Sequence, residues 1–344
     1  GELGSSHFDS SNLAQMGSLC STASVSPLDG GPEVGVAVGL REAELLEGAL
    51  HQPWPAASLE ALDNDGVVLI PNVLSTGATA SLRVYLESKL TAFQEAVASG
   101  EMSKEECFVP VRCHEQNRRH RLILTLEPDL VGAIAEALQV LGPFFQHALK
   151  CGDPLLAELG AFRSIEGAPR QPIHVDSGTG CRDLPGMVTA FVALQDVDEQ
   201  MGPTLFLPDT YRKPYAHAAK LSNPEWIKLL GEMRSIRLGT MSEGSCTLYD
   251  SHLLHAGGAN HSPRSRWLFQ MTFVPNHERF VLALRDEYIT MCQLGVHRLS
   301  ELKSGAIRSE SDDETKELMS FWHSFLHDEE IKRYAVLSKS LYRG

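Results

Sequence analysis

The feature that most constrains the fold is a change in sequence pattern near residue 155. Beyond that point, short runs rich in Val, Phe, Leu and Thr alternate with clusters of Gly, Pro and Asp. The runs lie at residues 156–165, 187–197, 203–208, 245–250 and 267–275. Short strands separated by turn residues are typical of an all-β sandwich or barrel. We therefore expect a β core over about residues 155–275.

The segments that flank this core carry the 3.6-residue spacing of amphipathic helices. Helices are predicted over residues 37–50, 82–97 and 129–148. Residues 63–75 (DNDGVVLIPNVLS) instead predict a strand over 67–70 between two turns. Helical spacing returns after Pro275. The whole pattern favours a mainly β fold with flanking helices.

The two ends of the chain are expected to lie outside the folded domain. Residues 1–36 are rich in Ser and Gly, contain no Lys or Arg, and lack an apolar segment. They resemble neither a secretory signal nor an Arg-rich transit peptide, so we expect a flexible leader. A single domain over residues 37–280 and a helical C-terminal extension over 281–344 complete the predicted organisation.

Charge and cysteine content exclude several classes of protein. The 30 Lys and Arg residues stand against 44 Asp and Glu residues, a net charge of −14. This balance argues against binding to nucleic acid or to an anionic membrane surface. No apolar run reaches the roughly 18 residues of a membrane-spanning helix. The 7 cysteines form no CxxC pair. We therefore expect reduced thiols in an intracellular, cytoplasmic protein.

The segment QPIHVD at 171–176 contains the densest group of candidate metal ligands. Side chains at positions i and i+2 of a strand point the same way, so His174 and Asp176 can reach one ion. Imidazole with carboxylate suits Fe(II), Mn or Zn. Alone, however, an HxD sequence is more often a surface pair than a metal site.

The segment 249–273 supplies candidates for a third ligand and an anion clamp. A closed β core can bring His255 beside His174, which would complete a 2-His-1-carboxylate triad. His252 is the competing histidine, but the spacing to the Asn and Arg downstream favours His255. Arg266 opens an apolar run and can point inward to pair with a dicarboxylate, whereas Arg264 follows a proline and is expected to be exposed.

These motifs, in this order, resemble the phytanoyl-CoA dioxygenase family of Fe(II)- and 2-oxoglutarate-dependent oxygenases. The segments that carry the resemblance are QPIHVD, ALQDVDEQMGPTLFLPDT and LYDSHLLHAGGANHSPRSRW. It extends over about residues 58–275 and includes the opening DNDGVVLIPNVLS. The resemblance implies a double-stranded β-helix core, also called a jelly-roll or cupin-like fold.

The resemblance also implies a role for individual residues. The iron ligands would be His174, Asp176 and His255, and the clamp on 2-oxoglutarate would be Arg266. Gln171 would lie near the cosubstrate, and Thr189 is a weaker candidate for the same pocket. This chain departs from the family at Gly257, where members often carry a hydroxyl residue that assists the clamp. Either Thr204 or Tyr249 would then serve, or clamping rests more heavily on Arg266.

The implied activity is hydroxylation of a small molecule with release of succinate and CO2. It would use Fe(II), 2-oxoglutarate and O2, with ascorbate as a supporting reductant. The basic cluster at 117–121 precedes a predicted strand, so His120 or Arg121 could point into the site. An anionic or CoA-linked substrate would fit such a cluster, and a solvated or ion-paired stretch is the alternative reading.

Two other functions remain open at the level of sequence. One is a catalytically idle binding protein on the same scaffold, which the retained ligand triad argues against and Gly257 weakly favours. The other is a cupin-like metalloenzyme that does not use 2-oxoglutarate and so would not require Arg266. The sequence leaves the oligomeric state open.

Overall fold

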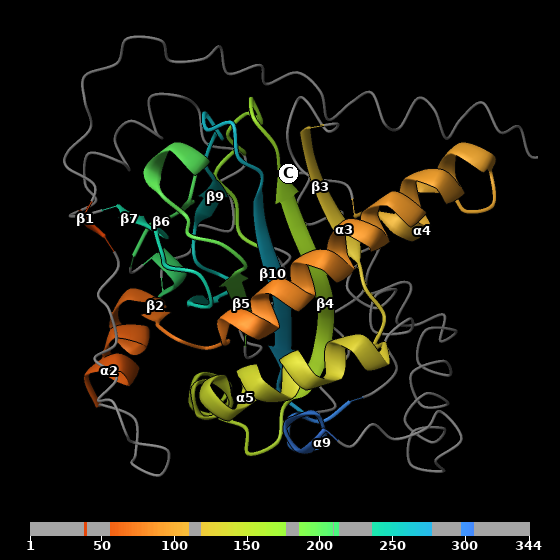
Figure 1. Ribbon diagram of the computed structural model, residues 1–344. Coiled ribbons are helices and arrows are strands. Elements are labelled where there is room, and N and C mark those ends of the chain that lie inside the picture. The colour runs from red at the N-terminus through yellow and green to blue at the C-terminus, as the bar shows by residue number, and fades with distance from the viewer. Residues whose placement is uncertain are drawn as a thin grey trace, which may run out of the picture. The chain divides into compact units, whose positions relative to one another are not determined.

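Two β-sheets form the centre of the computed structural model (Figure 1). The structure describes residues 38–39, 56–109, 118–176, 186–208, 210–212, 236–276 and 297–305. All of these belong to one of the two compact units into which the chain divides, made of Ala37–Lys220 and Met233–Gly344. The predicted leader lies outside the described residues, as does the predicted C-terminal extension apart from residues 297–305.

The larger sheet has six strands, and all of its neighbouring strands pair antiparallel. In spatial order they are β2 (Val67–Ile70), β8 (Cys246–Asp250), β5 (Val188–Ala193), β10 (Arg266–Val274), β4 (Leu155–Ser164) and β3 (Arg119–Ile123). The strand predicted over 67–70 is confirmed. Because β2 and β3 precede residue 155, the β core draws on more of the sequence than the predicted interval 155–275.

The smaller sheet has four short strands. Their order is β1 (Val38–Gly39), β7 (Arg237–Leu238), β6 (Thr204–Phe206) and β9 (His255–Gly257). The helix predicted over 37–50 is wrong at Val38 and Gly39, because these residues pair in parallel with β7. Long-range pairing here overrides the local helical spacing. The rest of that predicted helix lies outside the described residues.

The two sheets face one another across an apolar cluster. The ring of Phe206 on β6 lies 5.2 Å from the ring of Tyr249 on β8, centroid to centroid. Met241 and Leu268 pack in the same cluster. Two facing, mainly antiparallel sheets with helices outside them constitute the double-stranded β-helix arrangement. The predicted fold class, mainly β with flanking helices, is therefore confirmed.

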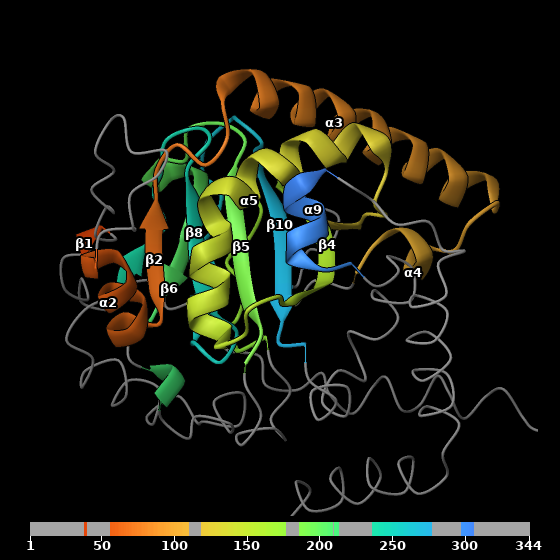
Figure 2. The ribbon, with the colours of Figure 1, turned by 90° about the horizontal axis from the view of Figure 1, so that it is seen from below.

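Helices cover the outer face of the larger sheet, as Figure 2 shows. The two long ones are α3 (Thr76–Ser99) and α5 (Pro128–Leu149), which confirm and lengthen the helices predicted over 82–97 and 129–148. Shorter helices are α2 (Ala56–Asp65), α4 (Lys104–Cys107) and α9 (Leu299–Ser304). Within the described residues, no helix combines the length and apolar character that a membrane span requires.

The two faces of strand β10 differ in the side chains that they bury. All nine of its residues are buried, and successive side chains point to opposite faces. One set, which includes Trp267 and Phe273, packs under the helices; the ring of Phe273 lies 4.5 Å from that of Phe145 on α5. The alternate set includes Arg266 and Gln270, so the inner face is partly polar although it is buried.

Candidate metal centre

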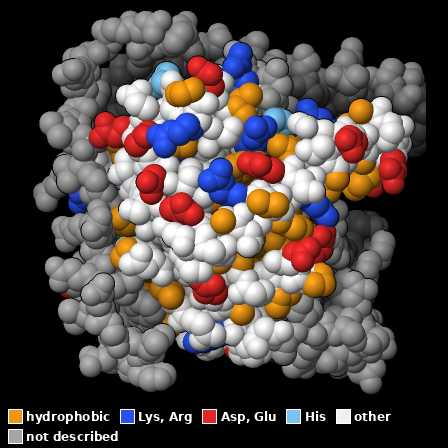
Figure 3. Space-filling model, viewed as in Figure 1, with side chains coloured by type: hydrophobic (Ala, Val, Ile, Leu, Met, Phe, Trp, Pro, Cys, Tyr) orange, Lys and Arg blue, Asp and Glu red, His pale blue; other side chains and the backbone are white. Residues whose placement is uncertain are grey.

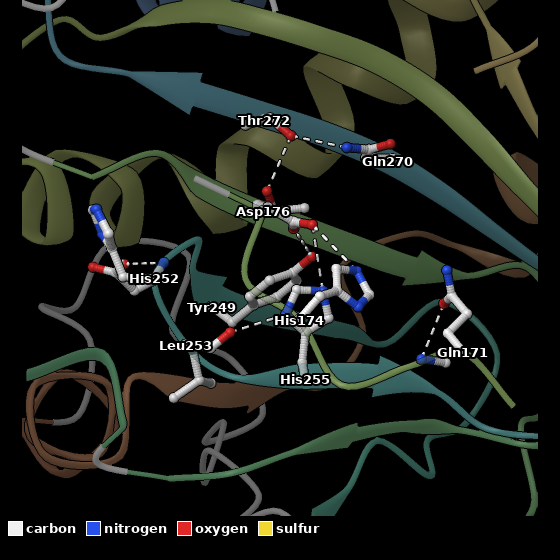
Figure 4. A network of polar contacts seen from close by, with 12 residues as sticks. Gln171, His174, Asp176, Tyr249, His252, Leu253, His255, Gln270 and Thr272 are labelled. Atoms are coloured by element: carbon white, nitrogen blue, oxygen red, sulfur yellow. Dashed lines mark hydrogen bonds and ion pairs between the residues drawn. The ribbon is translucent and has the colours of Figure 1, made fainter. Parts of the chain in front are cut away.

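Three predicted ligands converge on the inner side of the fold. One possible ligand atom from each of His174, Asp176 and His255 lies within 4.8 Å of the other two. The Oδ1 atom of Asp176 is 3.7 Å from Nε2 of His174 and 3.5 Å from Nε2 of His255 (Figure 4). Metal–ligand bonds of about 2.1 Å place neighbouring ligands about 3 Å apart, so a small inward shift would close these atoms on one ion.

Backbone pairing explains why residues so far apart in sequence meet. The N–H of His174 donates to the carbonyl of His255, and the reverse bond is also present, each at 2.9 Å. Two residues further along, the N–H of Asp176 donates to the carbonyl of Ser251 at 2.9 Å. The segment 171–176 therefore lies antiparallel to β9, joined to it by an isolated bridge between His174 and His255. Alternation along this extended segment places His174 and Asp176 on the same side.

Both imidazole rings are oriented by backbone carbonyls. The Nδ1 atom of His174 lies 2.8 Å from the carbonyl oxygen of Pro172, and that of His255 lies 3.0 Å from the carbonyl oxygen of Leu253. An Nδ1–H that donates to a carbonyl leaves the Nε2 lone pair for a cation. Each ring thus presents Nε2 toward Asp176 in the orientation of a metal ligand.

The carboxylate of Asp176 is divided between two roles. Its Oδ1 atom faces the two imidazoles, while its Oδ2 atom accepts a 2.8 Å hydrogen bond from the hydroxyl of Tyr249. Burial acts to raise the pKa of Asp176, but His255, His174 and Arg121 outweigh it, so the pKa lies far below its usual range. Burial, together with the Asp176 charge, raises the pKa of Tyr249, which therefore remains a donor.

The charge of Asp176 also acts on His255. Burial lowers the pKa of His255, but the carboxylate of Asp176 outweighs burial and the net shift is upward. A divalent cation held by the same three side chains would compensate the negative charge of Asp176.

The competing histidine lies elsewhere. His252 pairs with Asp250 through a 3.0 Å contact of its Nδ1 atom, and Figure 4 shows it pointing away from the three ligands. The choice of His255 over His252 for the ligand group is therefore supported by position.

A buried polar network lies beside Asp176 on the inner face of the larger sheet. Glu158 pairs with Arg121 at 2.8 Å and accepts hydrogen bonds from Gln270 and Thr272. Thr189, predicted to lie near a cosubstrate, has its Oγ1 atom 3.0 Å from that of Thr272 and so belongs to this network. Its side chain is buried on β5 opposite Tyr249.

Arg264 and Arg266 differ in exposure, as predicted. Arg264 is exposed and pairs with Asp198 at the surface. Arg266 is 2% exposed, donates to the carbonyl of Gly202 and to Oγ of Ser164, and leaves its Nε atom without a hydrogen-bond partner. Burial lowers the pKa of Arg266, and the nearby charge of Arg119 lowers it further.

Two polar side chains lie close to the α-carbon of Gly257. The N–H of Gly257 donates to Oε1 of Gln171 at 3.0 Å. A Cβ atom at residue 257 would lie closer than 3.0 Å to both Gln171 Oε1 and Arg119 Nη1. Of the two proposed substitutes, Tyr249 already donates to Asp176, whereas Thr204 lies directly opposite Gly257 in the β6–β9 pair.

The side chains of the basic cluster at 117–121 point to alternate faces of strand β3. Arg121 points inward, as one of the two alternatives predicted, whereas His120 lies on the other side and its ring is 5.8 Å from that of Phe108. Arg119 also points inward and is 1% exposed. Arg119 is not predicted from the sequence, because the apolar run that predicts this strand begins at Leu122, whereas the observed strand begins at residue 119. Arg118, in contrast, is exposed, and its Nη1 atom donates to the carbonyl of Glu166 at 2.8 Å.

Solved structures similar to this chain include those of SnoK, HygX and SnoN. The non-heme alpha-ketoglutarate-dependent carbocyclase SnoK from nogalamycin biosynthesis is 14% identical, with a TM-score of 0.47 over 64% of this chain and 84% of that chain. HygX from Streptomyces hygroscopicus, with nickel and 2-oxoglutarate bound, is 16% identical, with a TM-score of 0.47 over 65% and 88%. The epimerase SnoN is 19% identical, with a TM-score of 0.42 over 64% and 82%.

The sequence comparisons are more decisive for the family. Among curated proteins, none has a sequence that matches this chain. The model of the phytanoyl-CoA dioxygenase family, in contrast, matches residues 62–267, which contain all three candidate ligands and Arg266. The chain therefore belongs to the phytanoyl-CoA dioxygenase family.

Proposed function

We propose that the protein is an Fe(II)- and 2-oxoglutarate-dependent dioxygenase that hydroxylates a small molecule and releases succinate and CO2. The observation that carries this proposal is the convergence of His174, Asp176 and His255 on one point, with both Nε2 atoms and Asp176 Oδ1 facing inward. Two imidazoles and one carboxylate form the ligand set of non-heme Fe(II) oxygenases.

The donor set fits iron on chemical grounds. Imidazole nitrogen and carboxylate oxygen are borderline-to-hard ligands, and no cysteine is in the described ligand group. Three protein ligands on one side of an ion leave coordination positions for a cosubstrate and oxygen. Bound there, iron and 2-oxoglutarate would together activate O2, the oxidant: one oxygen atom would enter succinate as 2-oxoglutarate loses CO2, and the other would oxidise a C–H bond of the substrate.

Arg266 fits the distal carboxylate of 2-oxoglutarate. Its guanidinium is buried, and it forms no ion pair with a carboxylate of the described residues. A buried charge without a counterion is costly, and a planar guanidinium matches a carboxylate with two parallel hydrogen bonds. We propose that Arg266 binds that carboxylate. This feature also disfavours a cupin-like metalloenzyme without 2-oxoglutarate, which would not require such an arginine.

The contacts of Gln171 favour a role in cosubstrate binding more strongly than those of Thr189. Gln171 is fixed at the Arg266 end of the site through its Oε1 contact with Gly257, so its amide NH2 group is available as a donor. We propose that it contacts the cosubstrate. Thr189 is the weaker candidate, because its hydroxyl is already engaged with Thr272.

The chain itself would orient the metal ligands and exclude water from the site. Pro172 and Leu253 hold the two imidazole rings through backbone carbonyls, and Tyr249 holds the second oxygen of Asp176. The inner face behind them is buried, so reactive groups would be shielded from solvent. These features are of use to a catalyst and would be unnecessary in an idle binding protein.

Fe(II) binding to paired histidine variants tests the proposal. We expect wild type and His252→Ala to bind one Fe(II) per chain under anaerobic conditions, and His255→Ala to bind none at the same concentration. Release of succinate against a panel of metabolites would then identify the substrate. Loss of iron in His252→Ala with retention in His255→Ala would refute the assigned site.

A further inference from the structure

Arg119 and Arg266 occupy equivalent positions on either side of one residue. In the larger sheet, Ser164 of β4 pairs with Arg266 of β10 on one side and with Arg119 of β3 on the other. Residues directly opposite one another point to the same face of a sheet. Both guanidinium groups therefore extend from the inner face at the same level, and both side chains are almost fully buried.

The two charges are close enough to affect one another. Burial lowers the pKa of Arg266, and the charge of Arg119 is the second cause of that shift. Two like charges in a buried setting repel, and each is costly to remove from water. An anion between them would relieve both effects, and the unpartnered Nε atom of Arg266 marks a donor that a ligand could use.

Arg119 is fixed in a definite position. Its Nη2 atom donates to the carbonyl of Pro169 at 3.1 Å and to that of Gly258 at 2.8 Å. Its Nη1 atom lies over the α-carbon of Gly257, where a Cβ atom would be 2.6 Å away. Gln171 Oε1 borders the same small space. The place where a side chain at residue 257 would lie is therefore bordered by a guanidinium nitrogen of Arg119 and by the amide oxygen of Gln171.

We propose that Arg119 is a second cationic residue of the cosubstrate site, so that the distal carboxylate of 2-oxoglutarate is held between Arg119 and Arg266. This inference rests on the proposed function for the identity of the ligand. It assigns Arg119 a part in binding and in selecting a dicarboxylate over a 2-oxo acid with a single carboxylate. The rival role is purely structural, in which Arg119 only links the backbone at Pro169 to that at Gly258.

Binding of two 2-oxo acids to the full-length protein separates these roles. The protein is loaded with Mn(II) under anaerobic conditions and titrated calorimetrically with 2-oxoglutarate and with 2-oxopentanoate. The second compound has the same chelating end and chain length but no distal carboxylate. Wild type should strongly prefer 2-oxoglutarate. Arg119→Gln should weaken 2-oxoglutarate binding by about tenfold or more and leave 2-oxopentanoate binding unchanged.

Two further variants control for folding and for charge. Arg163→Gln removes an arginine from the same level of β4 but on the other face, where it stacks on Trp267, and should leave both affinities unchanged. Arg119→Lys keeps the charge and should retain part of the preference for 2-oxoglutarate, even if Arg119→Gln fails to fold.

The outcomes distinguish failure of this inference from failure of the proposed function. If wild type prefers 2-oxoglutarate and Arg266→Gln loses that preference, but Arg119→Gln and Arg119→Lys keep it, Arg119 is structural and the inference is wrong. A parallel loss of affinity for both acids in the Arg119 variants would overturn it as well. If wild type shows no preference between the two acids, the proposed cosubstrate is wrong.

Discussion

At the scale of single residues, the ligand triad could be predicted but its support could not. His174 and Asp176 are neighbours in sequence, so strand alternation alone indicates a shared site. The contacts of Tyr249 and Arg119 depend on which strands pair and in what register, and a single sequence contains no direct record of that. Tyr249 was considered only as a substitute for the hydroxyl missing at residue 257, and the structure places its hydroxyl on Asp176 instead.

The hydrogen bond from Tyr249 predicts how Asp176 binds a metal. Because Oδ2 accepts from the tyrosine, Oδ1 alone faces the imidazoles, and coordination should be through one oxygen. Tyr249→Phe keeps the ring that packs against Phe206 but releases the carboxylate. We expect Fe(II) affinity to fall by about 10- to 100-fold, measured by anaerobic titration.

A matched control for this change exists on the outside of the fold. Tyr85 on α3 also donates to a carboxylate, that of Glu127, at 2.8 Å. Tyr85→Phe therefore removes the same kind of hydrogen bond away from the site and should not change Fe(II) affinity. Equal Fe(II) affinity in wild type and Tyr249→Phe would contradict the assigned role of Tyr249.

Gly257 provides a second test at this scale. Replacement by Ser restores the hydroxyl that relatives often carry, but the added Cβ would meet Gln171 and Arg119. We expect Gly257→Ser to weaken 2-oxoglutarate binding by about tenfold or more, with Fe(II) binding retained, as measured by calorimetry. Tighter cosubstrate binding in this variant would show that Arg119 and Gln171 yield the space readily, contrary to this account.

At the scale of elements, prediction succeeded where the signal is local. The amphipathic spacing of α3 and α5 and the short apolar runs of β5, β8 and β10 were all recognisable. Strand β2 was predicted with its observed bounds, but the start of β3 was harder to predict, because β3 pairs with β4, which lies more than 30 residues away in sequence. Strand β1 was missed because two residues carry almost no periodic signal.

Glu127, the residue before α5, joins that helix to α3. Its carboxylate binds Lys89, accepts a hydrogen bond from Tyr85, and contacts Thr125 at 3.1 Å. Burial acts to raise the pKa of Glu127, but these three partners outweigh it and lower the pKa. A carboxyl group with a lowered pKa stabilises the fold above its unfolded-state pKa, and this contribution is lost as the pH falls through the folded-state value.

Glu127→Gln tests this link between helices. The difference in unfolding free energy between wild type and variant should be at most about 1 kcal/mol near pH 7. It should shrink as the pH falls below the ordinary carboxyl pKa of 4.5 and the wild-type group takes up its proton. Urea titrations at several pH values measure both quantities. A difference that grows toward acid would have the wrong sign for this mechanism.

At the scale of the whole molecule, net charge describes the surface and not the site. The chain carries a formal charge of −14, yet Arg119, Arg121 and Arg266 all point to the inner face of the larger sheet. On the face shown in Figure 3, Lys and Arg side chains lie among Asp and Glu side chains. The local charge inside the fold can thus differ in sign from the net charge, because a few buried charges dominate locally over many solvated ones.

The central claim is that metal and 2-oxoglutarate bind together between the ligand triad and Arg266. Its most direct test is the weak visible metal-to-ligand charge-transfer band that forms when 2-oxoglutarate chelates Fe(II) in the absence of oxygen. We predict this band in wild type and in Arg264→Ala, whose arginine pairs with Asp198 at the surface, and its loss in Arg266→Ala at the same concentrations. A wild-type protein with confirmed iron content and no band would contradict the account.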